Sequence, residues 1–569
     1  MGHLPESLSD IQEQGISAFA DSGTAYGPKN TRKENGDAGL KKKTFYFWLM
    51  TLWLLQMAMA IFFCVQKKGF HEDEFYTYYS TARTNGFYVE DQSWMDAETI
   101  RDEFVVLPGQ QFRYGLVRQV QSWDVHPPVY YWIFHTVASL VPGVFSKWIG
   151  LSVNLFCHGV NILLLAWLCY RISGGQKKLT LILTGFYWMT PAALSGVVFI
   201  RMYELLTTWV LLCAGLHVTE ILRMKENRSD VREEKLSGKR FLIPMMGVTY
   251  LGYLTQYYYA VFLFFAGFGF AVWLVARERR LRNVLYYAGT QAVALALSYV
   301  TYPACLGQMF RGQRGAQATE NFLNLSNTWE RLVYFYDLLN EYVFGKYLLV
   351  FWLLLVVLLI SRVLAKRRIF PEICKDAGRE PQVWLLLFAV AGYFVTVSKT
   401  GLLYEGTSIR YQLPVYGMVV LLLLMAMKTI WESKVRYIIL LCLLVINVKG
   451  LLSGKVEFLY PEAEQRVEFA AEQAAQGTET VYLYKEGDEW CIWGVADELM
   501  QYPGVYFVSA SGEDRLKDTK IKNSRSLVAY VAEGADAGTQ LQRLLQSNPN
   551  LRNYTQVATE KYCDVYLLE

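Results

Sequence analysis

Two short acidic motifs carry the residues best suited to chemistry in this chain. Asp73 and Glu74 lie in an HEDE motif directly after a long apolar run, and Asp124 and His126 lie in a later DVHPP motif. Carboxylates at a membrane boundary are costly to keep there unless they are paired or used. A partly desolvated carboxylate can accept a proton from a hydroxyl group. We therefore expect Asp73, with Glu74 as its neighbour, to be catalytic, although most acids in exposed loops have no such role.

The second motif places its polar residues on a fixed backbone. Two consecutive prolines follow His126 and restrict the chain before a helix predicted from Val129. Asp124 and His126 could then orient a phosphate group or the first carboxylate. In the alternative interpretation, Asp124 caps the helix by accepting hydrogen bonds from its first amide groups. Both roles could hold at once.

Arginines and tyrosines near the predicted ends of apolar runs complete a candidate substrate site. Arg201 and Arg410 could simply extend to the membrane interface, but arginine is also the preferred partner of phosphate. Tyrosines in the same turns could stack on a sugar or form an interfacial belt. Together with the acids, these residues describe a site with a base, phosphate-binding cations and aromatic walls. The tyrosines expected to bind substrate are Tyr203, Tyr257, Tyr258 and Tyr411, and Tyr259 could belong to the same aromatic wall.

The composition indicates a membrane protein that crosses the bilayer several times. Of the 569 residues, 53% are hydrophobic and 15% aromatic, and they gather in blocks of about 18 residues or more, the length that crosses a bilayer. A net charge of +4 does not argue for nucleic acid as a partner. Cys491 and Cys563 could form a disulfide if the last polar stretch lies outside the cell.

The distribution of basic residues predicts the orientation in the membrane. Three lysines at 41–43 precede the first apolar run, which reads as an uncleaved span with its amino end in the cytoplasm. Further basic clusters follow every second apolar block, which fits about eleven spans. The stretch 127–141 is too short to span and is expected to be a helix that lies at the outer interface or dips into the protein. This threading predicts a multi-pass cell-membrane protein with both acidic motifs on the extracytoplasmic side.

We therefore expect a mostly α fold, a polytopic helix bundle followed by a small α/β domain. Residues 1–43 should be a disordered cytoplasmic tail, and 44–454 the transmembrane domain, with the acidic motifs in a first outer loop at 67–147. Residues 455–569 should form an extracytoplasmic α/β domain, because β-rich runs alternate there with helical patterns. These runs lie at 480–484, 505–508 and 526–531. Without a glycine-rich phosphate loop, this domain is expected to dock or bind an acceptor.

The order of the motifs resembles a known enzyme family. An Asp-Glu pair just past the first span, then a DVHPP sequence before an aromatic helix, is similar to protein O-mannosyltransferases and to bacterial membrane proteins of glycosyltransferase family 39, which have the GT-C fold. The bacterial members also have Arg-Met-Tyr and Arg-Tyr-x-x-Pro turns, which match 201–203 and 410–414 here. The resemblance covers roughly 44–452. It implies a mannosyltransferase-like hexosyltransferase that takes a sugar from a polyprenyl phosphate in the outer leaflet.

The resemblance also implies roles and partners. Asp73 matches the catalytic base, and Asp124 and His126 match the second motif. The donor would be a polyprenyl-phosphate-linked sugar in the bilayer, and the acceptor a hydroxyl of a glycan, lipid or protein. Direct attack by that hydroxyl, with Asp73 as the base, predicts inversion at the anomeric carbon. No cofactor is certain, because members of the family differ in their need for metal. No spacing here indicates a metal site, but Asp73, Glu74, Asp124 and His126 could together supply ligands to a divalent ion.

Two other functional classes compete with a transferase. A transporter or flippase of a lipid-linked or anionic solute usually places charges at the middle of the membrane, on interrupted helices and in repeated halves. Here the charges gather at one face and no internal repeat is visible, which favours interfacial catalysis. A membrane-anchored sensor would leave the two acidic motifs unexplained.

Overall fold

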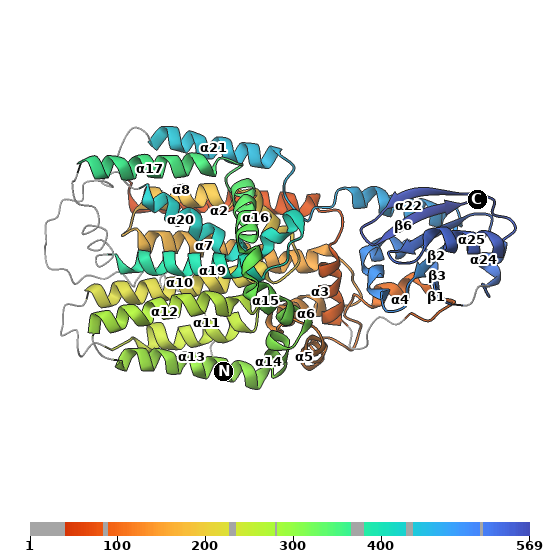
Figure 1. The fold of residues 1–569 in the computed structure, drawn as a ribbon, viewed down its shortest axis with the longest axis horizontal. Coiled ribbons are helices and arrows are strands. Elements are labelled where there is room, and N and C mark those ends of the chain that lie inside the picture. Colours follow the sequence, from red (N-terminus) through yellow and green to blue (C-terminus); the bar gives the residue numbers. More distant parts are fainter. Residues whose placement is uncertain are drawn as a thin grey trace, which may run out of the picture. The chain divides into compact units, whose positions relative to one another are not determined.

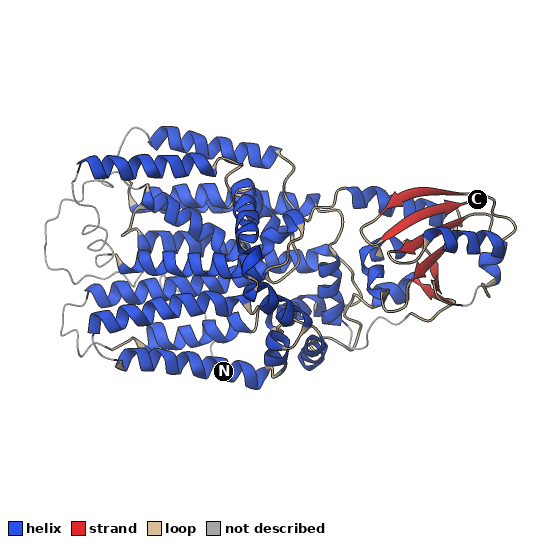
Figure 2. Ribbon diagram, viewed as in Figure 1, coloured by secondary structure: helices blue, strands red, loops and turns tan. Residues whose placement is uncertain are grey.

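The computed structural model describes residues 40–82, 89–226, 235–278, 281–365, 380–427, 436–512 and 516–569. Its long helices form a bundle and its strands gather in a separate sheet (Figure 2). Of the tail predicted at 1–43, only 40–43 fall within the described residues. Residues Lys41–Glu569 form one compact unit.

Several helices are long and apolar enough to cross a membrane, so the chain is a multi-pass membrane protein. Five qualify alone, and three bent pairs raise the number to eight among the described residues. The predicted number of about eleven is higher, in part because two shorter apolar helices among the described residues, Leu348–Val357 and Tyr437–Leu452, do not meet this length criterion. The single helices are α2 (Lys42–Gln66), α7 (Lys147–Ile172), α10 (Tyr203–Glu226), α12 (Tyr258–Glu278) and α19 (Pro381–Thr400). The pairs are α8 (Lys177–Tyr187) with α9 (Pro191–Val198), α13 (Arg282–Thr301) with α14 (Ala304–Phe310), and η4 (Glu405–Tyr411) with α20 (Leu413–Ala426). Shorter helices are η2 (Gly238–Leu242), α11 (Ile243–Tyr253), α17 (Leu348–Ala365) and α21 (Arg436–Leu452).

Helix α10 lies at the centre of the bundle. It packs against α7, α11, α12, α19 and α20 (Figure 1). Of the most apolar 18-residue stretch of α10, 72% is buried inside the protein, against 17% for the same stretch of α2. A β-carbon at Gly215 would overlap the ring of Trp167, so this glycine permits the close approach of α10 and α7. The central position of α10 fixes the turn that precedes its first residue, where Arg201 lies.

The segment between α2 and α7 contains short helices and one strand. They are α3 (Glu72–Ala82), β1 (Ser93–Asp96), α4 (Ala97–Asp102), α5 (Tyr114–Trp123) and α6 (Val129–Ser139). The short helix predicted at 127–141 is present as α6, which begins directly after Pro128. It buries Tyr130, Tyr131 and Phe134 in the protein. A second group of short helices precedes α17, namely α15 (Gln313–Leu323), η3 (Leu325–Asn327) and α16 (Thr328–Tyr342).

The carboxyl-terminal part is a mixed six-stranded sheet in the order β1-β3-β2-β4-β6-β5. Strands β2 (Glu479–Tyr484), β3 (Gly504–Ser509) and β4 (Leu527–Ala532) are parallel and central, and they coincide with the three predicted β-rich runs. Strands β5 (Tyr554–Thr559) and β6 (Cys563–Leu568) are antiparallel additions. The edge strand β1 comes from the segment before α7, with Ser93 opposite Phe507. The accompanying helices are α22 (Glu462–Ala475), η6 (Glu489–Gly494), α23 (Ala496–Leu499), α24 (Thr519–Asn523) and α25 (Ala537–Ser547).

Cys491 and Cys563, the two cysteines for which a disulfide was considered, are buried free thiols.

Two carboxyl groups contact one guanidinium group beside this sheet, and a third carboxyl group, that of Asp497, acts on both electrostatically. Arg466 Nη1 lies 2.6 Å from Glu560 Oε2, and Arg466 Nε lies 3.3 Å from Glu498 Oε1. Burial raises the pKa of Glu498 to about 8, with repulsion from Asp497 and Glu560 adding to the rise and Arg466 opposing it. Burial likewise raises the pKa of Glu560 to about 7. Because the acids outnumber the cation, we expect the cluster to retain a proton near neutral pH.

This cluster predicts that the protein becomes less stable as pH rises from mildly acidic to mildly basic values. The folded state binds the Glu498 proton more tightly than the unfolded chain, so the free energy of unfolding falls as pH rises from about 5 to about 8. We expect the thermal midpoint of the purified protein, followed by tryptophan fluorescence, to fall over this range. Glu498→Gln should flatten the dependence, whereas Glu468→Gln, an exposed site on α22, should preserve it. An unchanged dependence in Glu498→Gln would contradict this assignment.

Candidate functional site

Asp73 lies in the first turn of α3, between two arginines from distant parts of the chain. Arg410 Nη1 donates to Asp73 Oδ2 over 2.8 Å, and Arg201 Nη2 lies 3.8 Å from Asp73 Oδ1. Burial disfavours the carboxylate, but Arg410 and Arg201 outweigh it and hold the pKa of Asp73 well below its usual range. Asp73 is therefore ionised throughout the physiological pH range.

Arg201 connects the two acidic motifs. It lies in the break between α9 and α10, where its Nη1 donates to the backbone oxygen of Asp73 at 3.0 Å and to the hydroxyl of Tyr131 at 3.0 Å. Its Nη2 lies 3.3 Å from His126 Nε2. Because arginine can only donate, His126 Nε2 accepts this hydrogen bond. The side chain is 3% exposed, so these contacts fix its position.

Asp124 and His126 form the outer end of the same network. Nδ1 of His126 lies 3.0 Å from Asp124 Oδ2, so its hydrogen is available to the Asp124 carboxylate. Burial opposes the charge on Asp124, but His126 and Arg201 outweigh it and lower the pKa of this carboxyl. Pro128 occupies the N-cap position of α6. The helix-capping interpretation of Asp124 is therefore wrong. Asp124 instead contacts His126, which in turn contacts Arg201.

Glu74 points away from Asp73 and has a different environment. Its side chain is fully buried, and Oε2 accepts hydrogen bonds from Lys67 Nζ at 2.9 Å and from the backbone of His71 at 2.7 Å. Oε1 accepts from the backbone nitrogen of Ile200 at 2.7 Å. Glu74 thus ties α3 to the segment that presents Arg201.

Asn154 holds the same segment from the other side. Its amide Nδ2 donates to the backbone oxygens of Val197 and Phe199, and its Oδ1 accepts from the Tyr130 hydroxyl at 3.2 Å. Asn154 was not among the site residues predicted from the sequence. It could have been found as a polar residue within the apolar run that forms α7, because an amide without a hydrogen-bond partner would be costly there.

Arg410 is packed between two aromatic rings, and its buried Nε lacks a hydrogen-bond partner among the described residues. Its guanidinium group lies over the rings of Phe199 and Tyr411, with 5.6 Å and 5.1 Å to the centroids, and Nη2 donates to the Tyr411 hydroxyl at 3.2 Å. Within the described parts of the chain, the buried Nε atom has no hydrogen-bond partner. The buried Nε atoms of Arg101 and Arg466 are in the same condition, so this atom alone does not mark a ligand position.

Three of the four tyrosines predicted to line the site lie beside Arg410. The Tyr411 ring contacts Tyr203 at 6.0 Å and Tyr258 at 5.9 Å between centroids. Tyr257 instead donates to Gln308 at 2.6 Å. Nε2 of Gln308 donates to the backbone oxygen of Asp124 at 2.6 Å, so Tyr257 supports the second motif rather than the first.

His71 is a neighbour of Asp73 that the sequence analysis did not select. Its Nδ1 accepts from the Asp73 backbone at 3.1 Å and lies 3.7 Å from Asp73 Oδ2. Burial lowers the pKa of His71 to about 4, although Asp73 and Glu72 oppose the shift. The imidazole is therefore neutral at physiological pH and contributes a hydrogen-bonding surface rather than a charge.

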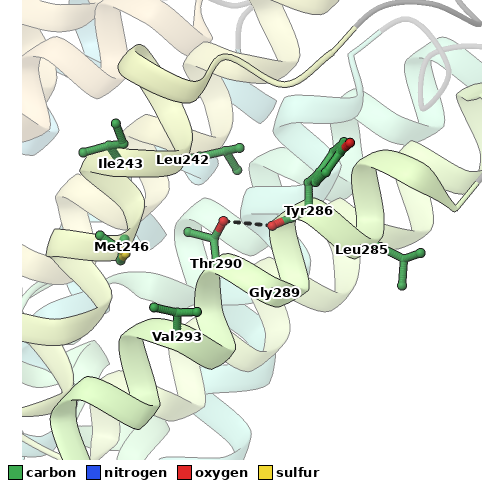
Figure 3. Close-up of a pocket in the computed structure, with 8 residues that line it drawn as sticks. All are labelled: Leu242, Ile243, Met246, Leu285, Tyr286, Gly289, Thr290 and Val293. Atoms are coloured by element: carbon green, nitrogen blue, oxygen red, sulfur yellow. Dashed lines mark hydrogen bonds between the residues drawn. The ribbon is translucent and has the colours of Figure 1, made fainter.

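Two other features bear on ligands. Among the residues whose placement is described, no group of three or more His, Cys, Asp or Glu side chains could hold a metal ion. An open pocket of about 410 Å³ lies between α11 and α13 (Figure 3). Its lining is mostly apolar, and the hydroxyl of Thr290 donates to the Tyr286 backbone oxygen. None of the candidate site residues lines it. Its lining residues are Leu242, Ile243, Met246, Leu285, Tyr286, Gly289, Thr290 and Val293.

Comparisons with known proteins give distant structural similarities. No protein-family model matches the chain, and no curated protein matches its sequence. ArnT from Cupriavidus metallidurans bound to undecaprenyl phosphate is similar over 92% of this chain and 97% of its own, with 12% identity and a TM-score of 0.46. The archaeal oligosaccharyltransferase AglB from Archaeoglobus fulgidus, in complex with an inhibitory peptide and a dolichol-phosphate, is similar over 91% and 74%, with 10% identity and a TM-score of 0.41. Similarities this distant carry no conclusion about fold or function, and the resemblance to glycosyltransferase family 39 stays a prediction.

Proposed function

We propose that this protein is a membrane glycosyltransferase that moves a sugar from a polyprenyl-phosphate donor to a hydroxyl acceptor. One observation carries the proposal. Arg201 and Arg410 converge on the carboxylate of Asp73 at the ends of membrane-spanning helices. Converging guanidinium groups recognise phosphate, and a carboxylate between them can receive a proton.

Donor binding would convert Asp73 from an ion-pair partner into a base. With both arginines beside it, Asp73 is a weak base because its pKa is strongly lowered. A phosphate drawing those guanidinium groups would remove part of their pull and raise the pKa of Asp73. Binding of the donor would thereby prepare the base, which limits the chemistry to the loaded enzyme.

The transfer step follows from this arrangement. The acceptor oxygen would attack the anomeric carbon while its proton passes to Asp73. The bond from the anomeric carbon to the phosphate oxygen would break, and polyprenyl phosphate would leave with the electron pair. Arg201 and Arg410 would stabilise the charge that develops on that oxygen. Asp73 alone is the base in this scheme, and Glu74 positions the Arg201 segment.

The remaining predicted residues have supporting roles. Asp124 and His126 would orient Arg201, and Tyr203, Tyr258 and Tyr411 would form the aromatic wall beside the phosphate. The site would face the extracytoplasmic side, as the basic residues predict. A hexose is the expected sugar, and a hydroxyl of a glycan, lipid or protein the acceptor.

Direct attack by the acceptor predicts inversion at the anomeric carbon. A donor with a β-linked phosphate should give an α-linked product, and the reverse, because the oxygen attacks from the face opposite the leaving group. The anomeric proton coupling of the purified product, measured by NMR, reports the configuration. A product with retained configuration would exclude direct attack assisted by Asp73.

Purified protein tests the proposal against its rival. Incubation with radiolabelled polyprenyl-phosphate sugar should release the label in a water- or acceptor-dependent reaction. Reconstituted vesicles report the alternative, a transporter or flippase, through movement of the intact donor or of a small anionic solute. Label movement without bond cleavage would favour that alternative.

A further inference from the structure

The carboxyl-terminal domain reaches the helix that carries Asp73. Lys561 Nζ donates to Glu72 Oε1 over 2.6 Å, and the Tyr562 hydroxyl donates to the same oxygen over 2.9 Å. Glu72 begins α3 and directly precedes Asp73. Lys561 and Tyr562 lie in the turn between β5 and β6, at the opposite end of the sequence.

Residues of the carboxyl-terminal domain hold the β5–β6 turn in place. The Trp490 ring contacts the Tyr562 ring at 4.8 Å, and the backbone of Glu533 donates to the Tyr562 backbone oxygen at 2.7 Å. Glu560, one residue before Lys561, pairs with Arg466 of α22 over 2.6 Å. The turn therefore contacts Glu72 from a fixed base rather than as a free loop.

Helix α3 contacts the same domain along a second line. The Tyr76 ring stacks on Trp493 of η6, with 5.1 Å between centroids and 28° between planes, and Tyr79 meets the same indole edge-on at 4.8 Å. On another side of α3, Thr77 donates to the Ile200 backbone oxygen at 3.2 Å. The helix is thus held between the bundle and the carboxyl-terminal domain.

The three consecutive acids of α3 each have a different cationic partner. Glu74 pairs with Lys67, Asp73 with Arg410 and Arg201, and Glu72 with Lys561. Each carboxylate is therefore held by its own cation, and Glu72 is the one that is held from the carboxyl-terminal domain.

We propose, on the basis of the function proposed above, that Lys561 and Tyr562 are positioning residues for Asp73. By holding Glu72 they fix the first turn of α3, so that Asp73 keeps its place when a donor phosphate draws Arg201 and Arg410 away. The carboxyl-terminal domain thereby controls the geometry of the base without touching the reacting atoms. A shift of about 1 Å in a reacting group can cost on the order of a hundredfold in rate, so such support has a measurable effect.

Steady-state kinetics of full-length variants test this proposal. Lys561→Gln and Tyr562→Phe should each lower kcat on the order of tenfold and leave the KM for the donor unchanged, because the arginines that bind phosphate remain. Lys561→Arg should restore most of kcat. Combining Lys561→Gln with Glu72→Gln should cost little more than either change alone, since both remove the same contact.

A matched control lies at the same junction. Lys68 pairs with Glu464 of α22 over 2.5 Å. Among the described residues, it forms no ion pair with Glu72 and none with the β5–β6 turn. Lys68→Gln should leave kcat unchanged. Tryptophan fluorescence and gel filtration identify any misfolded variant, and Tyr562→Phe, which removes one oxygen, serves if Lys561→Gln misfolds.

Each outcome has a distinct meaning. Unchanged kcat in both Lys561→Gln and Tyr562→Phe would overturn the proposal, as would a rise in donor KM at constant kcat. Absence of transfer in the wild-type protein would instead contradict the proposed function. If the wild-type protein transfers sugar and both variants have the same kcat as the wild type, only the positioning role is contradicted.

Discussion

Replacing Asp73 by asparagine is expected to lower kcat for sugar transfer on the order of a hundredfold or more. Asparagine has nearly the same shape but cannot accept the acceptor's proton. The fold should persist, because Arg201 also donates to the Asp73 backbone oxygen and to Tyr131, which the change leaves in place. The measurement is turnover of labelled polyprenyl-phosphate sugar by purified protein.

Donor binding gives this variant a second signature. Loss of the Asp73 charge frees Arg201 and Arg410 for the phosphate, so the Kd for the donor should stay the same or decrease. Glu98→Gln is the matched control, because Glu98 lies on α4 in the same loop with its side chain 77% exposed. Near-normal turnover in Asp73→Asn would exclude its role as the base.

Replacing Arg410 by lysine is expected to lower kcat/KM for the donor by about 10²–10³-fold. Lysine keeps the positive charge but loses the planar group that joins Asp73 and Tyr411 and that can pair with two phosphate oxygens at once. The effect should therefore fall on stabilisation of the leaving phosphate. Turnover across a range of donor concentrations separates binding from the chemical step.

Two comparisons make the Arg410 result specific. Arg118→Lys, an exposed arginine of α5 that contacts the Thr301 backbone, should have near wild-type turnover. Asp73→Asn combined with Arg410→Lys should cost less than the sum of the two separate losses in activation free energy, because the residues contact each other. Full activity of Arg410→Lys, or strict additivity, would show that Arg410 does not act with Asp73 on the phosphate.

Much of the grouping in the site could be anticipated from residue types. Asp73 and Asp124 follow or precede apolar runs, and Arg201 and Arg410 stand at helix ends, so a membrane threading alone predicts one common surface. The structure places these four side chains and His126 in one connected group. Their proposed roles await the experiments above.

The different environments of Asp73 and Glu74 could not be anticipated. The sequence suggested two acids in a loop, whereas they begin α3. Successive side chains on a helix differ in direction by about 100°, so Asp73 points to the arginines and Glu74 to Lys67. Lys67 gives no signal of its own, because a lysine after a span reads as an interfacial residue.

The sequence predicts the central strands of the sheet but not the strands β1 and β5. The central strands β2, β3 and β4 are almost entirely buried and therefore read as continuous apolar runs. Strand β5 lies at the edge and is mostly exposed, so its sequence lacks that pattern. Strand β1 has four residues and pairs with β3 from a distant segment, which no local pattern reveals.

An experimental structure of the protein with a polyprenyl phosphate bound tests the central claim most directly. We expect phosphate oxygens within about 3 Å of the guanidinium groups of Arg410 and Arg201, and the Asp73 carboxylate beside them with its ion pairs weakened. A phosphate bound elsewhere, with Arg410 still paired to Asp73, would contradict the account.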